Sequence, residues 1–289
     1  MDPLEIEFAA YDGLLSVVGL FGLAFLLALV SETVWDVLRG NREKWGETAA
    51  NIAIGLVSAV LERTAYGIVF IVGLVFASYF AVFDLPNGWW TIPLAVIVAD
   101  FTYYWMHRAE HEIRLFWANH SVHHSSPEFN FTTALRISWM DALIEWIFFI
   151  PMVLMGFSVV ETVIGLIVVV AYQSWIHTEK VGKLGWFDRV FNTPSAHRVH
   201  HGSNPEYIDK NYGGMLIIWD RMFGTYEPEV APVVYGITVP INTHNPVVIN
   251  FKEYRDLVRD VARAKTWQQA IGYVLRGPGW QPDQTKEDT

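Results

Sequence analysis

Histidine is the residue type whose spacing in this sequence most directly indicates chemistry. Ten histidines occur in 289 residues, and eight of them form three short clusters with the patterns HxxxH, HxxHH and HxxHH. Residues three and four apart share one face of a helix, so each cluster directs two or three imidazoles to one place. The members are His107 and His111, then His120, His123 and His124, and finally His197, His200 and His201.

Eight imidazoles exceed the four ligands of a tetrahedral zinc ion and suit two metal ions held close together. Imidazole binds iron, copper, zinc and nickel, so the ligand type leaves the metal open. The sequence contains no Cys, which excludes thiolate ligands and disulfides. We therefore predict a dimetal site with nitrogen ligands, in which zinc can replace the native metal when the protein is overexpressed.

Four residues outside the clusters are further candidates for this site. His177 lies where the last apolar stretch ends, and we predict that it is a ninth ligand. Asp100 shares a helical stripe with His107 and is predicted to orient an imidazole. Glu112 points away from the ligand face, which makes it a candidate for contact with a cofactor. Asn211 follows the third cluster by ten residues and is a candidate for a hydrogen bond to a ligand.

The composition is typical of a membrane protein, with 52% hydrophobic and 17% charged residues. Residues 13–30 carry no charge over 18 positions and match the length of a membrane-spanning helix. We expect further spans at 64–83 and from about 90 to 104. Residues 146–176 would be too long for one span and too short for two. They are predicted to form a membrane hairpin that turns near Gly156.

These stretches predict an all-α integral membrane protein of one domain, residues 1–289, with about four or five membrane segments and a histidine-rich dimetal cap. The membrane helices occupy 13–104, the first two clusters 105–145, the hairpin 146–176, and the third cluster and C-terminal region 177–289. With these spans all 20 Lys and Arg fall on one side of the membrane, and such an excess marks the cytoplasmic side. We expect a multi-pass protein of a bacterial inner membrane or the endoplasmic reticulum, with its site in the cytoplasm. The net charge of −10 does not suggest a nucleic-acid partner.

A dimetal site at a membrane surface indicates a substrate that lies in the membrane, and lipids fit. The inert C–H bonds of a lipid require activated oxygen, which two iron ions and O2 can supply. Hydroxylation and desaturation begin with the same removal of a hydrogen atom, so ligand spacing does not separate a hydroxylase from a desaturase. A metal-binding membrane protein without catalytic activity is a third hypothesis.

The three histidine motifs, in this order between apolar stretches, resemble the sterol desaturase and fatty acid hydroxylase superfamily of membrane di-iron enzymes over about residues 95–230. Longer strings are similar to the alkylglycerol monooxygenase family, which cleaves glyceryl ethers with O2 and tetrahydrobiopterin. They include DFTYYWMHRAEHE at 100–112, WIHTEKVGKLG at 175–185, and NTPSAHRVHHGSNPEYIDKNYGGMLIIWDRMFGTYEPE at 192–229.

This resemblance implies a role for each matching position. The eight clustered histidines fall on the iron-ligand positions of the superfamily, and His177 falls on an additional histidine. Glu112 falls on a glutamate implicated in pterin use. The resemblance further implies a membrane lipid as substrate, and electrons that come from tetrahydrobiopterin or from a separate reductase. A sterol or fatty acid hydroxylase or desaturase is the alternative within the superfamily.

Overall fold

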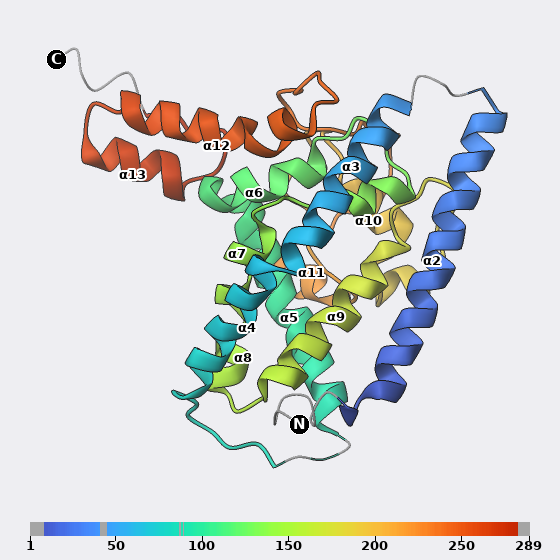
Figure 1. The fold of residues 1–289 in the computed structure, drawn as a ribbon. Helices are drawn as coiled ribbons and strands as arrows, with labels where there is room; N and C mark the ends of the chain where they lie inside the picture. Colours follow the sequence, from blue (N-terminus) through green and yellow to red (C-terminus); the bar gives the residue numbers. More distant parts are fainter. Residues whose placement is uncertain (1–8, 41–44, 87, 89, 283–289) are drawn as a thin grey trace.

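The computed structural model of the chain describes residues 9–40, 45–86, 88 and 90–282, and it is built from helices (Figure 1). Within these residues there is no β-strand, only the isolated bridges Phe191–Leu216 and Gly202–Tyr235. The prediction of an all-α fold is confirmed for this part of the chain. The predicted domain 1–289 also includes terminal residues that lie outside it.

Five helices pack alongside one another and form the body of the molecule (Figure 1). They are α2 (Asp12–Leu38), α4 (Ala65–Ser78), α5 (Thr91–Glu112), α8 (Trp146–Leu154) and α9 (Val159–Ser174). Their contacts bury an apolar core that includes Leu74, Phe149, Met152 and Val169.

The close packing of α5 against α9 depends on small residues. A Cβ atom added at Gly165 of α9 would lie 2.9 Å from the carbonyl oxygen of Ala95 and 2.9 Å from the Cβ of Ala99. A larger side chain at position 165 would therefore separate the two helices. This matters for the site because α5 carries the first histidine cluster and α9 leads into His177.

The remaining helices mostly gather at one end of this body, the upper end in Figure 1. The longer ones are α3 (Trp45–Glu62), α6 (Arg114–His124), α10 (Pro194–His200), α12 (Pro246–Arg263) and α13 (Trp267–Leu275). The short elements are α7 (Asp141–Ile144), α11 (Ile218–Phe223) and the 3₁₀ helices Phe131–Leu135 and Phe187–Arg189.

One described helix, α2, is long and apolar enough to cross a membrane by itself, with 27 residues and a mean hydropathy of 2.6. Helices α3 and α4 meet at a bend of 46° and qualify as a second span only when they are counted together. Helices α8 and α9 have nine and 16 residues, fewer than the roughly 20 needed for a full span. The count of four or five membrane segments therefore stays a prediction.

The chain turns between α8 and α9 at Gly156, where φ is +97°, which is the place where the sequence predicts a turn. The N–H of Val82 donates to the carbonyl oxygen of Leu154 at 2.9 Å, so the connection after α4 lies against this turn. Both lie at the lower end of the body in Figure 1, whereas α6 and α10 lie at the upper end. Helix α5 continues past residue 104 to Glu112, so the first histidine cluster is part of this helix.

Candidate metal centre

The nine predicted ligands converge from α5, α6, α10 and the segment after α9 into two adjacent groups. Within each group, one ligand atom from every residue lies within 4.8 Å of those from all the others. The five-histidine group consists of His107, His111, His120, His124 and His200. The four-histidine group consists of His123, His177, His197 and His201.

Helix geometry explains how the motifs divide between the groups. His107 and His111, like His120 and His124, are four residues apart and stay in one group. Consecutive residues on an α-helix point about 100° apart, since one turn takes 3.6 residues. The pair His123 and His124 therefore contributes one imidazole to each group, and so do His200 and His201 at the end of α10.

Helix α10 begins at a position that the sequence marks clearly. Thr193 is its N-cap, with the side-chain oxygen accepting from the N–H of Ala196, and Pro194 occupies the first turn. The guanidinium of Arg198 donates to the carbonyl oxygens of Thr178 and Val181 at 3.0 and 2.8 Å. It thereby ties the segment that carries the ninth ligand to the helix that carries the third cluster.

The imidazoles of the four-histidine group approach one another through their Nε2 atoms. Nε2 of His177 lies 3.1 Å from that of His123 and 2.9 Å from that of His197. Nε2 of His201 lies 3.1 Å from that of His197. In the five-histidine group, Nε2 of His107 lies 2.9 Å from Nε2 of His120.

Backbone carbonyl groups determine the tautomer of three of these rings. A carbonyl oxygen only accepts, so Nδ1 of His107 must donate to Tyr212 O at 2.8 Å, and Nδ1 of His177 to Gln173 O at 2.9 Å. Nδ1 of His200 donates to Lys210 O at 3.0 Å in the same way. In a neutral ring the Nε2 atom then carries a lone pair, so these rings direct lone pairs into the centre.

Metal ions fit this arrangement of nitrogen atoms. With metal–nitrogen bonds of about 2.1 Å, two ligands at a right angle lie about 3.0 Å apart, and two at the tetrahedral angle about 3.4 Å apart. The observed Nε2 to Nε2 distances of 2.9 to 3.1 Å match the right angle. The donor set therefore fits two metal ions, and imidazole nitrogen is a ligand for iron as well as for zinc.

Burial keeps the ligands neutral. Removal from water, aided by the neighbouring His111, lowers the pKa of His107 to about 3, and burial lowers the pKa of His177 to about 4. Burial is also the main cause that lowers the pKa of His120, His123, His124, His197, His200 and His201. All eight rings are therefore free of a second proton at pH 7 and available to a metal.

Asp100 was predicted to orient an imidazole, and in the structure its carboxylate contacts a loop that reaches His107. Its carboxylate accepts from the backbone N–H of Met215 at 2.6 Å, from that of Leu216 at 3.1 Å, and from the indole N–H of Trp219 at 2.8 Å. It thereby holds the loop whose Tyr212 carbonyl accepts from His107. Asp100 contacts the loop and not an imidazole.

The side chain of Asn211 bonds to backbone groups, and that of Glu112 pairs with another side chain at the surface. The amide of Asn211 donates to the carbonyl oxygens of Ala196 and Glu227 at 3.0 and 2.8 Å, which closes the loop after α10. The side chain of Glu112 is 44% exposed and pairs with Arg108 at 2.9 Å. Neither side chain points to the nitrogen atoms of the two groups, and their predicted roles toward a cofactor stay predictions.

Sequence reasoning missed the carboxyl group that lies closest to a candidate ligand. Oε2 of Glu110 lies 3.3 Å from Nδ1 of His120, and the Glu110 residue is 1% exposed. Glu110 forms a cluster with Asp141 and Glu145, whose oxygen atoms come within 4.8 Å of one another. The signal in the sequence was the position of Glu110 three residues after His107, on the same helical face.

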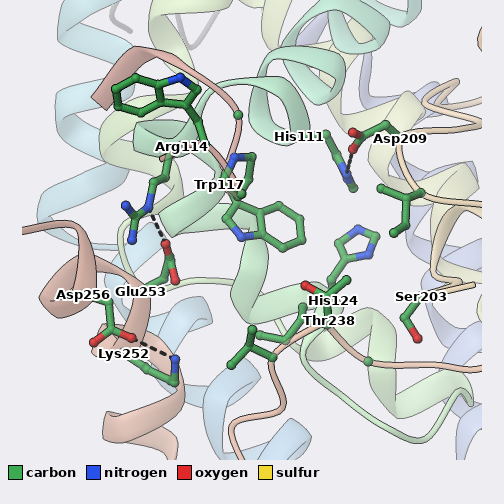
Figure 2. Close-up of a pocket in the computed structure, with 18 of the residues that line it drawn as sticks. His111, Arg114, Trp117, His124, Ser203, Asp209, Thr238, Lys252, Glu253 and Asp256 are labelled. Carbon is green, nitrogen blue, oxygen red and sulfur yellow. Dashed lines mark hydrogen bonds and ion pairs between the residues drawn. The ribbon is translucent and has the colours of Figure 1, made fainter. Parts of the chain in front are cut away.

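A cavity of about 620 Å³ opens beside the centre and reaches four of the histidines, namely His111, His124, His200 and His201 (Figure 2). The rest of its wall combines apolar residues such as Ile208, Val239 and Trp280 with a group of charged residues. Arg114 donates to Glu253 at 2.8 Å, and Lys252 pairs with Asp256 at 2.8 Å. Trp117 adds an aromatic surface next to His111. A mainly apolar wall with a few charged groups is typical of a small-molecule site.

Known protein families and relatives match the part of the chain that contains the candidate ligands. The model of the fatty acid hydroxylase family matches residues 92–225, which include all nine candidate ligands. Alkylglycerol monooxygenase of Xenopus tropicalis is 43% identical over 201 residues, which are 69% of this chain and 44% of that protein. The enzyme of the same name from Danio rerio is 36% identical over 288 residues, 98% of this chain and 64% of that protein.

A more distant relative is ornithine lipid hydroxylase OlsE of Rhizobium tropici, 29% identical over 167 residues, which are 53% of this chain and 48% of that protein. No solved structure matches the chain. The chain spans between 44% and 64% of the length of the alkylglycerol monooxygenases it matches. These findings confirm the resemblance to the fatty acid hydroxylase family and to alkylglycerol monooxygenases.

Proposed function

We propose that this relative of the fatty acid hydroxylase family is a membrane-bound di-iron monooxygenase that hydroxylates a C–H bond of a lipid. The observation that carries the proposal is the convergence of nine imidazoles into two groups with Nε2 to Nε2 distances of 2.9 to 3.1 Å. The relatives that match the chain across this region bear the names of lipid hydroxylases and monooxygenases and support it.

In this proposal the five-histidine group holds one iron ion and the four-histidine group holds the other. With O2 and two electrons, the bound ions supply the oxidant that replaces a lipid hydrogen by a hydroxyl group, and the second oxygen atom leaves as water. Burial keeps eight of the nine rings neutral, and the carbonyl oxygens of Tyr212, Gln173 and Lys210 fix the direction of three of them.

Among lipids we favour a glyceryl ether, because the most similar proteins reported above are alkylglycerol monooxygenases. The lone pairs of an ether oxygen stabilise a radical on the adjacent carbon, so this C–H bond is weak. Hydroxylation of that carbon gives a hemiacetal, which separates into a fatty aldehyde and a free glycerol hydroxyl. The protein then needs only to hold that carbon at the metals.

The reductant is proposed to approach from the water-exposed side. The cavity of about 620 Å³ reaches four of the histidines, and the charged residues in its wall, such as Arg114 and Lys252, are the proposed contacts of a soluble donor such as tetrahydrobiopterin, or of the tip of a reductase. The backbone of Glu112 borders Gly277, which lines this cavity. The connections without Lys or Arg lie at the other end of the body, which supports a cytoplasmic site.

The test uses the full chain in lipid nanodiscs, loaded with iron and supplied with O2 and tetrahydrobiopterin. A 1-O-alkylglycerol should be consumed and a fatty aldehyde should appear. If the protein leaves the ether intact but hydroxylates or desaturates a sterol or an acyl chain, it is still a lipid oxidase, but the assignment of ether cleavage is wrong. A protein that binds two metals and consumes no O2 with any of these lipids is a metal-binding protein, and the proposal is then wrong.

A pair of histidine variants provides the matched control. His123→Ala removes a ligand of the four-histidine group and should abolish both full metal binding and turnover. His244 lies outside both groups, has a side chain that is 59% exposed, and contacts Glu47 at 3.0 Å. His244→Ala should therefore retain two metals and activity. Equal losses in both variants would contradict the assignment of the ligands.

A further inference from the structure

The ring of His120 differs from those of His107, His177 and His200 in the partner of its Nδ1 atom. Three rings have a backbone carbonyl oxygen at Nδ1, from Tyr212, Gln173 and Lys210. His120 instead faces a side chain, since Oε2 of Glu110 lies 3.3 Å away. The second carboxylate near a ligand ring is that of Asp209, whose Oδ1 lies 3.7 Å from Nδ1 of His111.

The position of Glu110 has a consequence for the opposite side of the ring. Nε2 of His107 carries a lone pair because its Nδ1–H donates to Tyr212 O. Nε2 of His120 lies 2.9 Å from Nε2 of His107. If Glu110 accepts the Nδ1–H of His120, then Nε2 of His120 carries a lone pair as well. Two lone pairs at that distance repel each other unless a cation lies between them.

We propose that Glu110 is a positioning residue, which accepts the Nδ1–H of His120 and so presents the Nε2 lone pair of this ring to the metal of the five-histidine group. The inference rests on the proposed dimetal function and adds a residue to it. A carboxylate behind a metal-bound imidazole fixes the tautomer and orientation of the ring and raises its basicity. Glu110 has no metal-facing role of its own in this assignment.

Glu110 is well placed for a role specific to one metal. It lies on α5 between His107 and His111, and it faces His120 on α6, so every ring next to it belongs to the five-histidine group. Among the described residues, the carboxylate contacts of candidate ligands are those of His120 and His111, both in the five-histidine group, whereas Nδ1 of His177 in the other group donates to Gln173 O. Loss of Glu110 should therefore weaken one metal site and spare the other.

The experiment measures the number and affinity of bound zinc ions by competition with a chelator on the full chain in detergent, which requires no activity. The wild type should bind two ions. Glu110→Leu should weaken one of them by about 10- to 100-fold, the usual effect of removing such a partner. Glu110→Asp keeps the charge but withdraws the oxygen by one methylene, and it should weaken the same ion. Glu110→Gln can still present an amide oxygen to Nδ1–H and should keep most of the affinity.

Glu145→Leu is the matched control because Glu145 belongs to the same carboxyl cluster and not to the histidine groups. It should bind both ions with the affinity of the wild type. Unchanged affinity for both ions in Glu110→Leu and Glu110→Asp would overturn the role of Glu110, and so would an equal loss in Glu145→Leu. A wild-type protein that binds fewer than two ions would instead contradict the dimetal centre itself.

Discussion

Oε1 of Glu32 accepts a hydrogen bond of 2.7 Å from the hydroxyl group of Thr178, the residue that follows His177. The other carboxylate oxygen accepts from the N–H of Phe131, also at 2.7 Å. Glu32 is buried on α2, the one described helix that is long and apolar enough to cross a membrane by itself. This carboxylate therefore connects the apolar helix directly to two segments that surround the metal centre.

Removal of the Thr178 hydroxyl should destabilise the protein. Thr178→Val leaves a buried carboxylate oxygen of Glu32 without its donor, which costs about 1 to 3 kcal/mol. The melting temperature in detergent should fall, and metal binding by the four-histidine group should weaken because His177 is adjacent. Thr33→Val is the control, since the hydroxyl of Thr33 bonds only to Leu29 O in its own helix. Equal melting temperatures for the two variants would contradict the proposed connection.

Arg136 should be the most sensitive charged residue outside the ligands. It is 1% exposed, donates to Glu47 and Asn51 at 2.8 and 2.9 Å, and also binds Val122 O near the second histidine cluster. Arg136→Met leaves Glu47 as an uncompensated buried charge and should cost about 3 to 5 kcal/mol of unfolding free energy.

Arg255→Met offers the comparison for Arg136. The side chain of Arg255 is 69% exposed, and its ion pair with Asp256 should contribute less than about 1 kcal/mol. Denaturant unfolding of both variants checks the difference. If Arg136→Met is as stable as Arg255→Met, the buried pair of Arg136 and Glu47 does not hold the second cluster in place.

The low pKa values of the ligands predict how metal affinity depends on pH. A histidine with an ordinary pKa of about 6.5 becomes protonated below this pH, so affinity falls about tenfold per ligand at pH 5.5. With the pKa of His107 lowered to about 3 and that of His177 to about 4, these rings stay neutral at pH 5.5. Zinc affinity of the folded protein should therefore change little between pH 7.5 and 5.5.

The lowered pKa values of these histidines also affect the free energy of unfolding of the metal-free protein. Below about pH 6.5 these histidines become protonated in the unfolded chain but stay neutral in the folded protein. They therefore lower the free energy of unfolding as the pH falls toward 4.

The prediction for zinc affinity is tested by zinc competition at about pH 7.5 and about pH 5.5, with circular dichroism to check that the protein stays folded. A steep loss of affinity at pH 5.5 would show that the rings titrate normally.

Membrane orientation can be tested by labelling because the chain has no Cys of its own. A cysteine at the exposed position Asp84, next to the turn after α4, should react with an impermeant thiol reagent on intact cells. A cysteine at Glu206, near the third histidine cluster, should react only after the membrane is opened. The reverse pattern would place the metal centre on the outer side.

The candidate ligands could be selected from the sequence because helix periodicity brings residues four apart together, as for His120 and His124. His177 was selected because it ends an apolar stretch, and its role as a ninth ligand stays a prediction. The division into two groups required the arrangement of α5, α6 and α10, which no local pattern contains. For the same reason Glu110 was overlooked, since its partner His120 lies on a different helix.

The supporting residues were harder to predict than the ligands. Asp100 was selected because it lies within an apolar helix, but its partners are the backbone N–H groups of Met215 and Leu216 and the indole N–H of Trp219, which sequence does not place nearby. The contact of Glu32 with Thr178 and that of Arg136 with Glu47 each join residues more than 80 positions apart in the chain. Helix lengths were also misjudged where a predicted span, 64–83, became the 14-residue α4.

The most direct test of the account follows the oxygen atom. The iron-loaded protein is given a 1-O-alkylglycerol, a reductant and ¹⁸O₂, and any aldehyde is reduced in place to the fatty alcohol before it exchanges with water. The account predicts one ¹⁸O atom in the alcohol derived from the alkyl chain, and none with His123→Ala. Aldehyde that carries only ¹⁶O, or ¹⁸O in no lipid of any class, would contradict the claim that two histidine-bound metals insert oxygen into a lipid C–H bond.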